Sequence, residues 1–191
     1  MKFSFQVLLM AILLSVFQFA SALEVQGVRF EETVKINGND LQLNGAGLRT
    51  KYFFKVYVAG LYVPAKTRDA EAIIVSKQPR RLTLNMLRKM DAADIHEALF
   101  NGLTENNSYE QIEVLRTRIQ QLEAILNAVK VVNAGDVIAF DFLPGQGTRV
   151  TVKGQVKDVI AGDDMAQALL RIWLGKKPAQ SDLKKALLAA N

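Results

Sequence analysis

The order of the expected elements predicts an α+β fold with an antiparallel sheet. Strands come first along the chain, then two helices, a hairpin and further helices, whereas a parallel sheet would alternate strands and helices throughout. The second observation is a long strand at 52–63 with apolar or aromatic side chains on both faces, which is typical of a strand covered on both sides. With 191 residues, the chain is long enough for one hydrophobic core and short for two.

The first 22 residues carry the three-part pattern of a secretory signal peptide. Lys2 gives a positive start, an apolar run follows at 7–17, and Ala20-Ser21-Ala22 is a small-x-small cleavage pattern. The run is shorter than the ~20 apolar residues that a membrane span needs. We therefore expect cleavage after Ala22, one mature domain over 23–191 without a membrane span, and a periplasmic or secreted location. The alternative is an uncleaved N-terminal anchor.

The first part of the mature chain is predicted to be strand. β-Favouring residues indicate one strand at 24–36, the Asn-Gly-Asn-Asp turn at 37–40 reverses the chain, and 41–44 returns as the second strand of a hairpin. Gly45-Ala46-Gly47 is interpreted as a glycine-rich bend, because glycine tolerates tight backbone geometry. The aromatic strand at 52–63 follows this bend.

The middle of the chain is predicted to change from strand to helix. A short helix is expected at 67–76, and alternating apolar residues indicate a strand at 81–87. Asp91 is a suitable N-cap for a helix that runs to about Asn106. Ser108 and Gln111 form a capping-box pattern at the start of a second helix.

The second helix has apolar residues at alternating steps of three and four. They are Ile112, Leu115, Ile119, Leu122, Leu126 and Val129. This spacing fits a coiled-coil partner helix, but the run is short, so a single amphipathic helix packed on the sheet is the preferred interpretation.

The last part of the chain is predicted to be a hairpin followed by helices. Strands are expected at 137–143 and 148–152, with a short third strand at 155–160. Asp163 is interpreted as the N-cap of a helix that runs to Trp173, and Ser181 as the cap of the last helix.

The inventory of reactive side chains excludes most catalytic classes. The chain has no cysteine, so thiolate nucleophiles and Cys-ligated metal clusters are excluded. The single histidine, His96, has no nucleophile motif to serve and is interpreted as a partly exposed helix residue. We expect no metal and no cofactor. The net charge of +5 is modest, and export argues against a nucleic-acid partner.

Arg49 and Tyr57 are the candidate binding residues. The glycine-rich bend places Arg49 at the mouth of a strand pair, and strand periodicity allows the Tyr57 hydroxyl to project into the interior. A guanidinium and a hydroxyl at the end of an apolar slot would bind a carboxylate or an enolate-like oxygen. The alternative is that Arg49 is a surface ion-pair partner and Tyr57 a packed core aromatic.

Two segments of the chain resemble chalcone isomerase-type proteins, and in particular the bacterial exported branch of that family. They are LNGAGLRTKYFFKVYVAGLYV at 43–63 and ALLRIWLGKKPAQSDLKKALL at 168–188. The resemblance implies an open-faced β-sandwich, in which a large antiparallel sheet has a layer of helices over one face and a ligand cleft between them.

The resemblance also assigns roles to single positions. Arg49 matches the catalytic arginine of the family, while Tyr57 falls where the family has a water-positioning Thr. The Tyr and Asn that the plant enzymes carry on one helix fall at Asp94 and Asn101. A substrate-contacting Thr-Met pair falls at Ile172-Trp173, where the Trp would add apolar lining.

These departures from the plant pattern favour binding over catalysis. Non-catalytic members of the family hold a fatty-acid carboxylate with an Arg and a Tyr, a role that suits Arg49 and Tyr57. We therefore expect a monomeric binder of a small amphipathic acid, such as a fatty acid. One alternative is an intramolecular lyase of the chalcone-flavanone isomerase type, acting on a flavonoid-like or other unsaturated ketone. Another is a non-catalytic partner-binding protein that uses the helix at 108–130.

Overall fold

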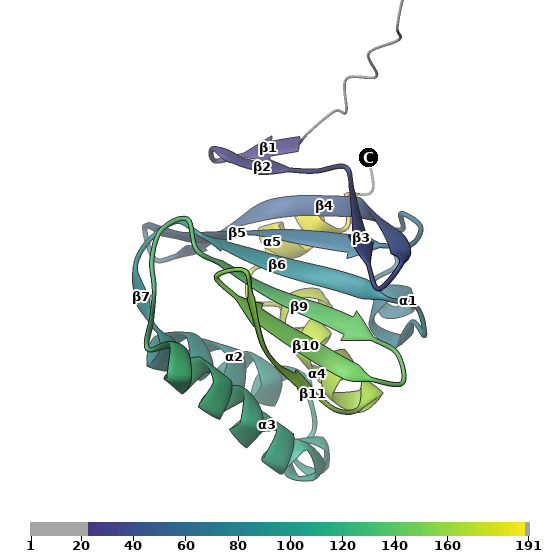
Figure 1. Ribbon diagram of the computed structural model, residues 1–191, viewed down its shortest axis with the longest axis vertical. Coiled ribbons are helices and arrows are strands. Elements are labelled where there is room, and N and C mark those ends of the chain that lie inside the picture. The colour runs from purple at the N-terminus through teal and green to yellow at the C-terminus, as the bar shows by residue number, and fades with distance from the viewer. Residues whose placement is uncertain (1–22, 190–191) are drawn as a thin grey trace, which may run out of the picture.

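The computed structural model describes residues 23–189 (Figure 1). The expected signal peptide and its cleavage site at Ala22 lie outside this range. The strands are β1 (Leu23–Val25), β2 (Val28–Phe30), β3 (Thr33–Ile36), β4 (Asn39–Lys51), β5 (Phe54–Val63), β6 (Arg80–Met86), β7 (Met90–Asp91), β8 (Val131–Val132), β9 (Val137–Leu143), β10 (Gly147–Val152) and β11 (Gln155–Ile160). The helices are α1 (Ala70–Val75), α2 (Ala92–Asn106), α3 (Tyr109–Val129), α4 (Asp163–Leu174) and α5 (Ser181–Leu187).

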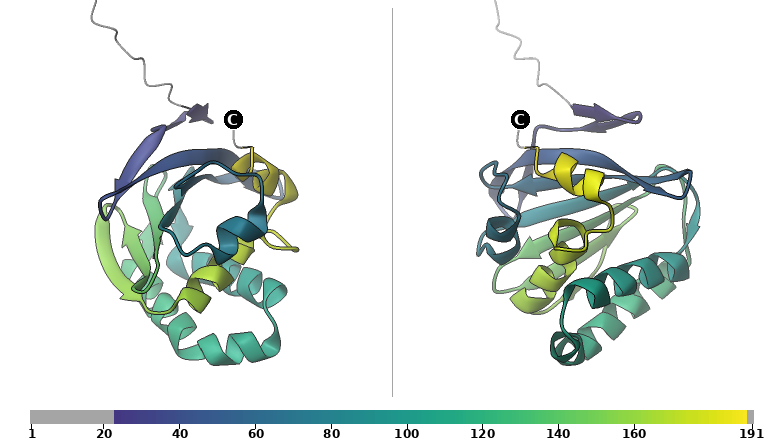
Figure 2. Two further views of the ribbon diagram at one scale, coloured as in Figure 1. Left: turned by 90° about the vertical axis from the view of Figure 1, so that its right-hand side faces the viewer. Right: turned by 180° about the vertical axis from the view of Figure 1, so that it is seen from behind.

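One seven-stranded antiparallel sheet organises the domain. Its order is β11-β10-β9-β6-β5-β4-β3, and the sheet curls around the helices, which lie against one face (Figures 1 and 2). The main core lies between them, where side chains from the helices meet the sheet; its largest buried members include Phe140, Leu82 and Trp173. The predicted α+β class, with a helical layer on one face of a large antiparallel sheet, is confirmed.

The apolar face of α3 is occupied within the chain. Leu115, Ile119, Leu122 and Leu126 are buried in the main core, and Ile112 and Val129 are partly buried against it. The helix is therefore amphipathic, as predicted, but it packs against α2 as well as against β11 at the edge of the sheet. No helix in the described part of the chain combines the length and apolar character that a bilayer crossing requires.

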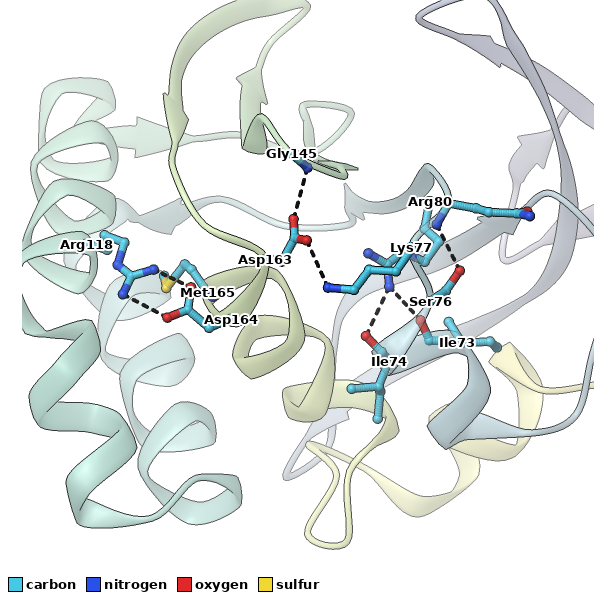
Figure 3. Close-up of polar contacts among 11 residues, drawn as sticks. Ile73, Ile74, Ser76, Lys77, Arg80, Arg118, Gly145, Asp163, Asp164 and Met165 are labelled. Atoms are coloured by element: carbon cyan, nitrogen blue, oxygen red, sulfur yellow. Dashed lines mark hydrogen bonds and ion pairs between the residues drawn. The ribbon is translucent and has the colours of Figure 1, made fainter.

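Arg80 anchors α1 to the start of β6 from a buried position. Its Nη1 donates to the carbonyl oxygens of Ile73 and Ile74 at 2.7 and 3.0 Å, in the last turn of α1 (Figure 3). The guanidinium also lies 5.7 Å from the centroid of the Phe142 ring. Burial lowers the pKa of Arg80 to about 10, and the charge of Asp163 opposes this shift.

The glycine-rich bend is a wrong prediction, and so is the single strand at 24–36. β4 runs without a break through Gly45, Ala46 and Gly47, because these residues pair with β5. A Cβ at Gly45 would overlap the backbone of Ala186 and Leu187, so the glycines let α5 lie directly on the strand. The segment 24–36 forms three short strands, since residues 26–27 make a turn between β1 and β2.

Two predicted helix caps are also wrong by one residue, whereas two others are confirmed. Gly162 and Gln180 occupy the N-cap positions of α4 and α5. Asp163 lies in the first turn instead, where its carboxylate accepts bonds from the Gly145 amide at 3.2 Å and from Lys77 at 3.1 Å (Figure 3). Asp91 is the N-cap of α2, and the capping box of Ser108 and Gln111 is present at α3.

Candidate functional site

Arg49 and Tyr57 are directly opposite each other on β4 and β5. Cross-strand partners in an antiparallel pair project to the same face, which here is the face that carries the helices. The pairing register shifts between Arg49 and Thr50, immediately before the β4–β5 turn. The two candidate residues are therefore brought together at one end of the sheet.

The Tyr57 hydroxyl is held in place by a tryptophan from α4. Trp173 Nε1 donates to the hydroxyl oxygen at 2.9 Å, and the indole is almost fully buried beside Phe140. Burial raises the pKa of Tyr57, while the Trp173 hydrogen bond and the nearby Arg49 guanidinium partly oppose the shift. The phenol therefore stays protonated at neutral pH, and because its oxygen accepts from Trp173, its own proton is available for donation to another group.

Arg49 is half-buried and has no carboxylate partner. Within residues 23–189, none of the ion pairs involves Arg49. Its Nη1 donates to the Thr50 carbonyl and, at 3.3 Å, to Gln180 Oε1. The same amide oxygen accepts from the Thr50 backbone N–H at 2.9 Å, so Gln180 fixes the end of β4. The interpretation of Arg49 as a surface ion-pair partner is therefore wrong.

Both residues open onto a pocket of about 970 Å³ between the sheet, α2 and α4. This volume lies at the upper end of the range for small-molecule sites, roughly 300–1,000 Å³. Its apolar lining comes from both layers: Val56, Leu84 and Met86 belong to the sheet, and Ile95, Leu99 and Ile172 to the helices. The pocket thus combines apolar side chains from both layers with the Arg49 guanidinium and the Tyr57 hydroxyl at one end of the sheet.

The other expected site residues also line this pocket. Ile172 and Trp173 are buried in its wall, whereas Asn101 is exposed on α2. Asp94, which takes the place of the plant tyrosine, is another lining residue. All five candidates, Arg49, Tyr57, Asn101, Ile172 and Trp173, thus meet around one space, while their contact with a ligand stays a prediction.

Two contributions to the site were missed by the sequence analysis. Gln180 was quoted only as part of the segment 168–188, and Trp173 was expected to supply bulk rather than a hydrogen bond. No local signal marks either role, since each partner lies more than a hundred positions away along the chain, as in the separation of 131 between Arg49 and Gln180.

The rim of the pocket carries charges of both signs. Its cations include Lys51, Arg88 and Lys89 near the sheet, and its acids come from α2 and the residue before it. Within residues 23–189, no three His, Asp or Glu side chains gather in a way that would hold a metal ion. Arg49 and Tyr57 can bind an anion and donate hydrogen bonds to it.

Comparison with known proteins agrees with this architecture. Residues 22–189 match the chalcone isomerase-like family. A crystal structure of an Arabidopsis thaliana fatty-acid binding protein aligns with a TM-score of 0.70 at 14% sequence identity, covering 88% of this chain and 96% of that one. No curated protein matches the sequence. At such low identity the structural match shows a shared fold, and together with the family match over nearly all of the described residues it leads to one conclusion: the chain belongs to the chalcone isomerase-like family.

Proposed function

We propose that this protein is exported and binds a fatty acid or another small amphipathic anion in the pocket between the sheet and the helices. The observation that carries this proposal is Arg49, a half-buried guanidinium without a carboxylate partner in the described chain, beside a protonated hydroxyl at a pocket with apolar side chains in both walls. A charge in such a place favours an anionic head group, since a guanidinium can bind a carboxylate through two parallel hydrogen bonds.

The remaining geometry supports a ligand with one anionic end and an apolar body. The carboxylate would accept bonds from Arg49 and from the Tyr57 hydroxyl, whose proton is not used by Trp173. The body would lie against Val56, Leu84 and Leu99. The similarity in fold to a plant fatty-acid binding protein supports the same ligand class.

An intramolecular lyase is the second candidate, because the same pair of donors would stabilise an enolate oxygen. Ile172 and Trp173 bring no hydroxyl to the position where the plant enzymes contact substrate, and the Trp173 N–H is bonded to Tyr57. Mixing the protein with a chalcone and following its absorbance separates the two candidates. The binding proposal predicts no acceleration over the uncatalysed rate.

Export rests on residues 1–22 and needs its own test. We expect the mature protein to begin at Leu23 and to be found in the periplasm or the medium as a monomer. Intact mass of the protein from cell fractions, together with size-exclusion chromatography, checks all three points. A cell-associated protein that retains residues 1–22 would contradict the export proposal.

The ligand proposal is tested with a matched pair of probes, palmitic acid and its methyl ester. Native mass spectrometry of the purified mature protein should show a bound fatty acid, or uptake of added palmitic acid at one site. The methyl ester keeps the chain but lacks the charge, so its affinity should be lower by about ten- to a hundredfold. Equal affinity for both probes, or none for either, would contradict the proposal.

A further inference from the structure

The β4–β5 turn exposes an aromatic cluster. Five consecutive residues, Lys51 to Lys55, are exposed; the rings of Tyr52, Phe53 and Phe54 are 84%, 98% and 59% exposed. The other large apolar side chains that are exposed in the described chain are scattered singly or in pairs, as single surface apolar residues commonly are. Three adjacent exposed rings at one turn therefore form a distinct apolar surface.

The backbone of this turn does not favour the residues that occupy it. Lys51 pairs with Phe54, so Tyr52 and Phe53 form a two-residue hairpin loop. Tyr52 has φ of 56°, a conformation that glycine or asparagine normally adopts in such loops. An exposed tyrosine in this position gains little from the rest of the chain to offset the strain. Folding alone thus does not account for the aromatic residues, which points to a partner outside the chain.

The turn lies at the mouth of the ligand pocket. Lys51, Tyr52 and Phe54 line the pocket together with Arg49 and Tyr57, which follow on the same two strands. At about 3.3 Å per residue, Tyr57 is only some 10 Å along β5 from Phe54. A surface that received the aromatic rings would therefore face the pocket opening.

Cations surround the aromatic rings. Lys51 and Lys55 flank them in sequence, and the Arg88 guanidinium lies 4.7 Å from the centroid of the Phe54 ring, with Lys89 exposed beside it. The acids that line the pocket, Asp91, Asp94, Glu97 and Glu105, belong to α2 and the residue before it rather than to the aromatic turn. Aromatic rings among cations suit the interface of an anionic bilayer, where rings enter the head-group region and lysine and arginine bind lipid phosphates.

We propose that the aromatic turn, Lys51 to Lys55 with Arg88 and Lys89, docks on the surface of an anionic lipid bilayer. Docking would place the pocket mouth against the membrane, so that an amphipathic ligand passes between bilayer and pocket without crossing water. Docking on the membrane goes beyond the proposed function and does not depend on it. Only the transfer of a ligand between bilayer and pocket rests on the proposed function.

Vesicle sedimentation tests the docking. The mature protein is mixed with vesicles of phosphatidylcholine containing about 30% phosphatidylglycerol, and with vesicles of phosphatidylcholine alone, at low and high salt. We expect binding to the anionic vesicles at low salt, and a loss of at least about tenfold in affinity without the anionic lipid or at about 0.5 M salt.

The decisive variant is Tyr52→Asn with Phe53→Gly. Asparagine adopts the positive φ of Tyr52 more readily than tyrosine does, and Phe53 is fully exposed, so the fold should remain stable while two rings are removed. Its affinity for anionic vesicles should fall about tenfold or more. Tyr109→Asn is the matched control, since it also removes an exposed ring: Tyr109 is 74% exposed. Tyr109 lies at the start of α3, after the C-terminal end of α2, whereas the aromatic turn lies near the N-terminal end of α2.

The remaining outcomes separate the two proposals. Arg49→Ala should bind vesicles as the unchanged protein does, even though its fatty-acid affinity falls. Failure of the unchanged protein to bind anionic vesicles, or equal binding by the Tyr52→Asn, Phe53→Gly variant, overturns the docking proposal. Self-association in the absence of vesicles that this variant abolishes would also overturn it, because the turn would then be a contact between two copies of the chain.

Discussion

Arg49 and Arg80 lie on the same face of one sheet, but their surroundings differ completely. Arg49 pairs with Tyr57, which in turn pairs with Met86, the last residue of β6. Arg80 is the first residue of β6, so the two arginines lie near opposite ends of the sheet. Arg80 is 3% exposed and donates to two backbone carbonyls, whereas Arg49 is half-buried beside a pocket and lacks a carboxylate partner in the described chain. Arg80 therefore contributes to the stability of the fold, whereas we propose that Arg49 binds the ligand.

The difference teaches that the groups around an arginine decide its role. Arg80 bonds to carbonyls at the end of α1, is influenced by the charge of Asp163, and is buried, so no external anion can reach its guanidinium. Arg49 meets the Gln180 amide, the Thr50 carbonyl and Tyr57, all of them neutral, so an anion can still add a favourable interaction. The comparison predicts that one arginine governs stability and the other affinity.

Arg80→Ala should have the largest effect, a loss of about 3–4 kcal/mol in the free energy of unfolding. The change leaves the carbonyls of Ile73 and Ile74 without a donor and opens a cavity beside Phe142. Urea unfolding followed by circular dichroism measures it. Arg116→Ala, which removes an exposed arginine, is the control and should change stability by no more than about 0.5 kcal/mol. If Arg80→Ala were as stable as Arg116→Ala, Arg80 would have no special role in stability and its contrast with Arg49 would be lost.

Arg49→Ala should reduce fatty-acid affinity about ten- to a hundredfold, because charged hydrogen bonds to the carboxylate are lost. Its unfolding free energy should change by less than about 1 kcal/mol, since the side chain is only partly buried and forms no ion pair in the described chain. The fatty-acid affinity of Arg49→Lys should lie between those of Arg49→Ala and the unchanged protein, because lysine keeps the charge but lacks the planar set of donors of arginine. Isothermal titration calorimetry measures all three proteins. If Arg49→Ala lost as much stability as Arg80→Ala but kept its fatty-acid affinity, Arg49 would have a structural role and the binding role would be wrong.

Tyr57→Phe should weaken binding by about tenfold, since it keeps the ring and removes one donor. Because the pKa of Tyr57 is raised, this prediction can also be tested by the dependence of affinity on pH. The unchanged protein should hold its ligand until the pH passes the normal tyrosine value of about 10, and lose affinity above that, when the phenolate repels the carboxylate. Tyr57→Phe should lack this alkaline loss. Affinity measured against pH checks the sign, and identical profiles for both proteins would contradict the role of the hydroxyl.

Gln180→Ala should have the smallest effect, a few-fold loss of affinity corresponding to about 0.5–1 kcal/mol. The amide oxygen positions Arg49 and Thr50 rather than a ligand, so the charge remains and only its placement becomes looser. Gln121→Ala is the control, because Gln121 lies on α3, bonds to Asp158 on β11 and is not among the residues that line the pocket. Equal affinities of the two variants would show that Arg49 needs no positioning.

The motif at 43–49 shows where sequence reasoning succeeded and where it stopped. The sequence analysis selected Arg49 and Tyr57 as binding residues, and the structure pairs them directly across β4 and β5, although the turn at 52–53 was not predicted. The glycines were misread as a bend because their reason lies far along the chain: α5 occupies the space that their side chains would fill. Asn44 is buried for the same reason, bonding to the carbonyls of Leu187 and Thr67.

The sequence by itself determined the element types, the class of fold and the residues with binding chemistry, because periodicity and turn residues act locally. The tertiary structure alone decided that Arg49 would have no carboxylate partner among residues 23–189, that Trp173 would orient Tyr57, and that Gln180 would reach the end of β4. These outcomes depend on groups that are distant along the chain. The burial of a side chain and the partners of its polar atoms are set by the folded surroundings. They can therefore be known only once the fold brings these groups together.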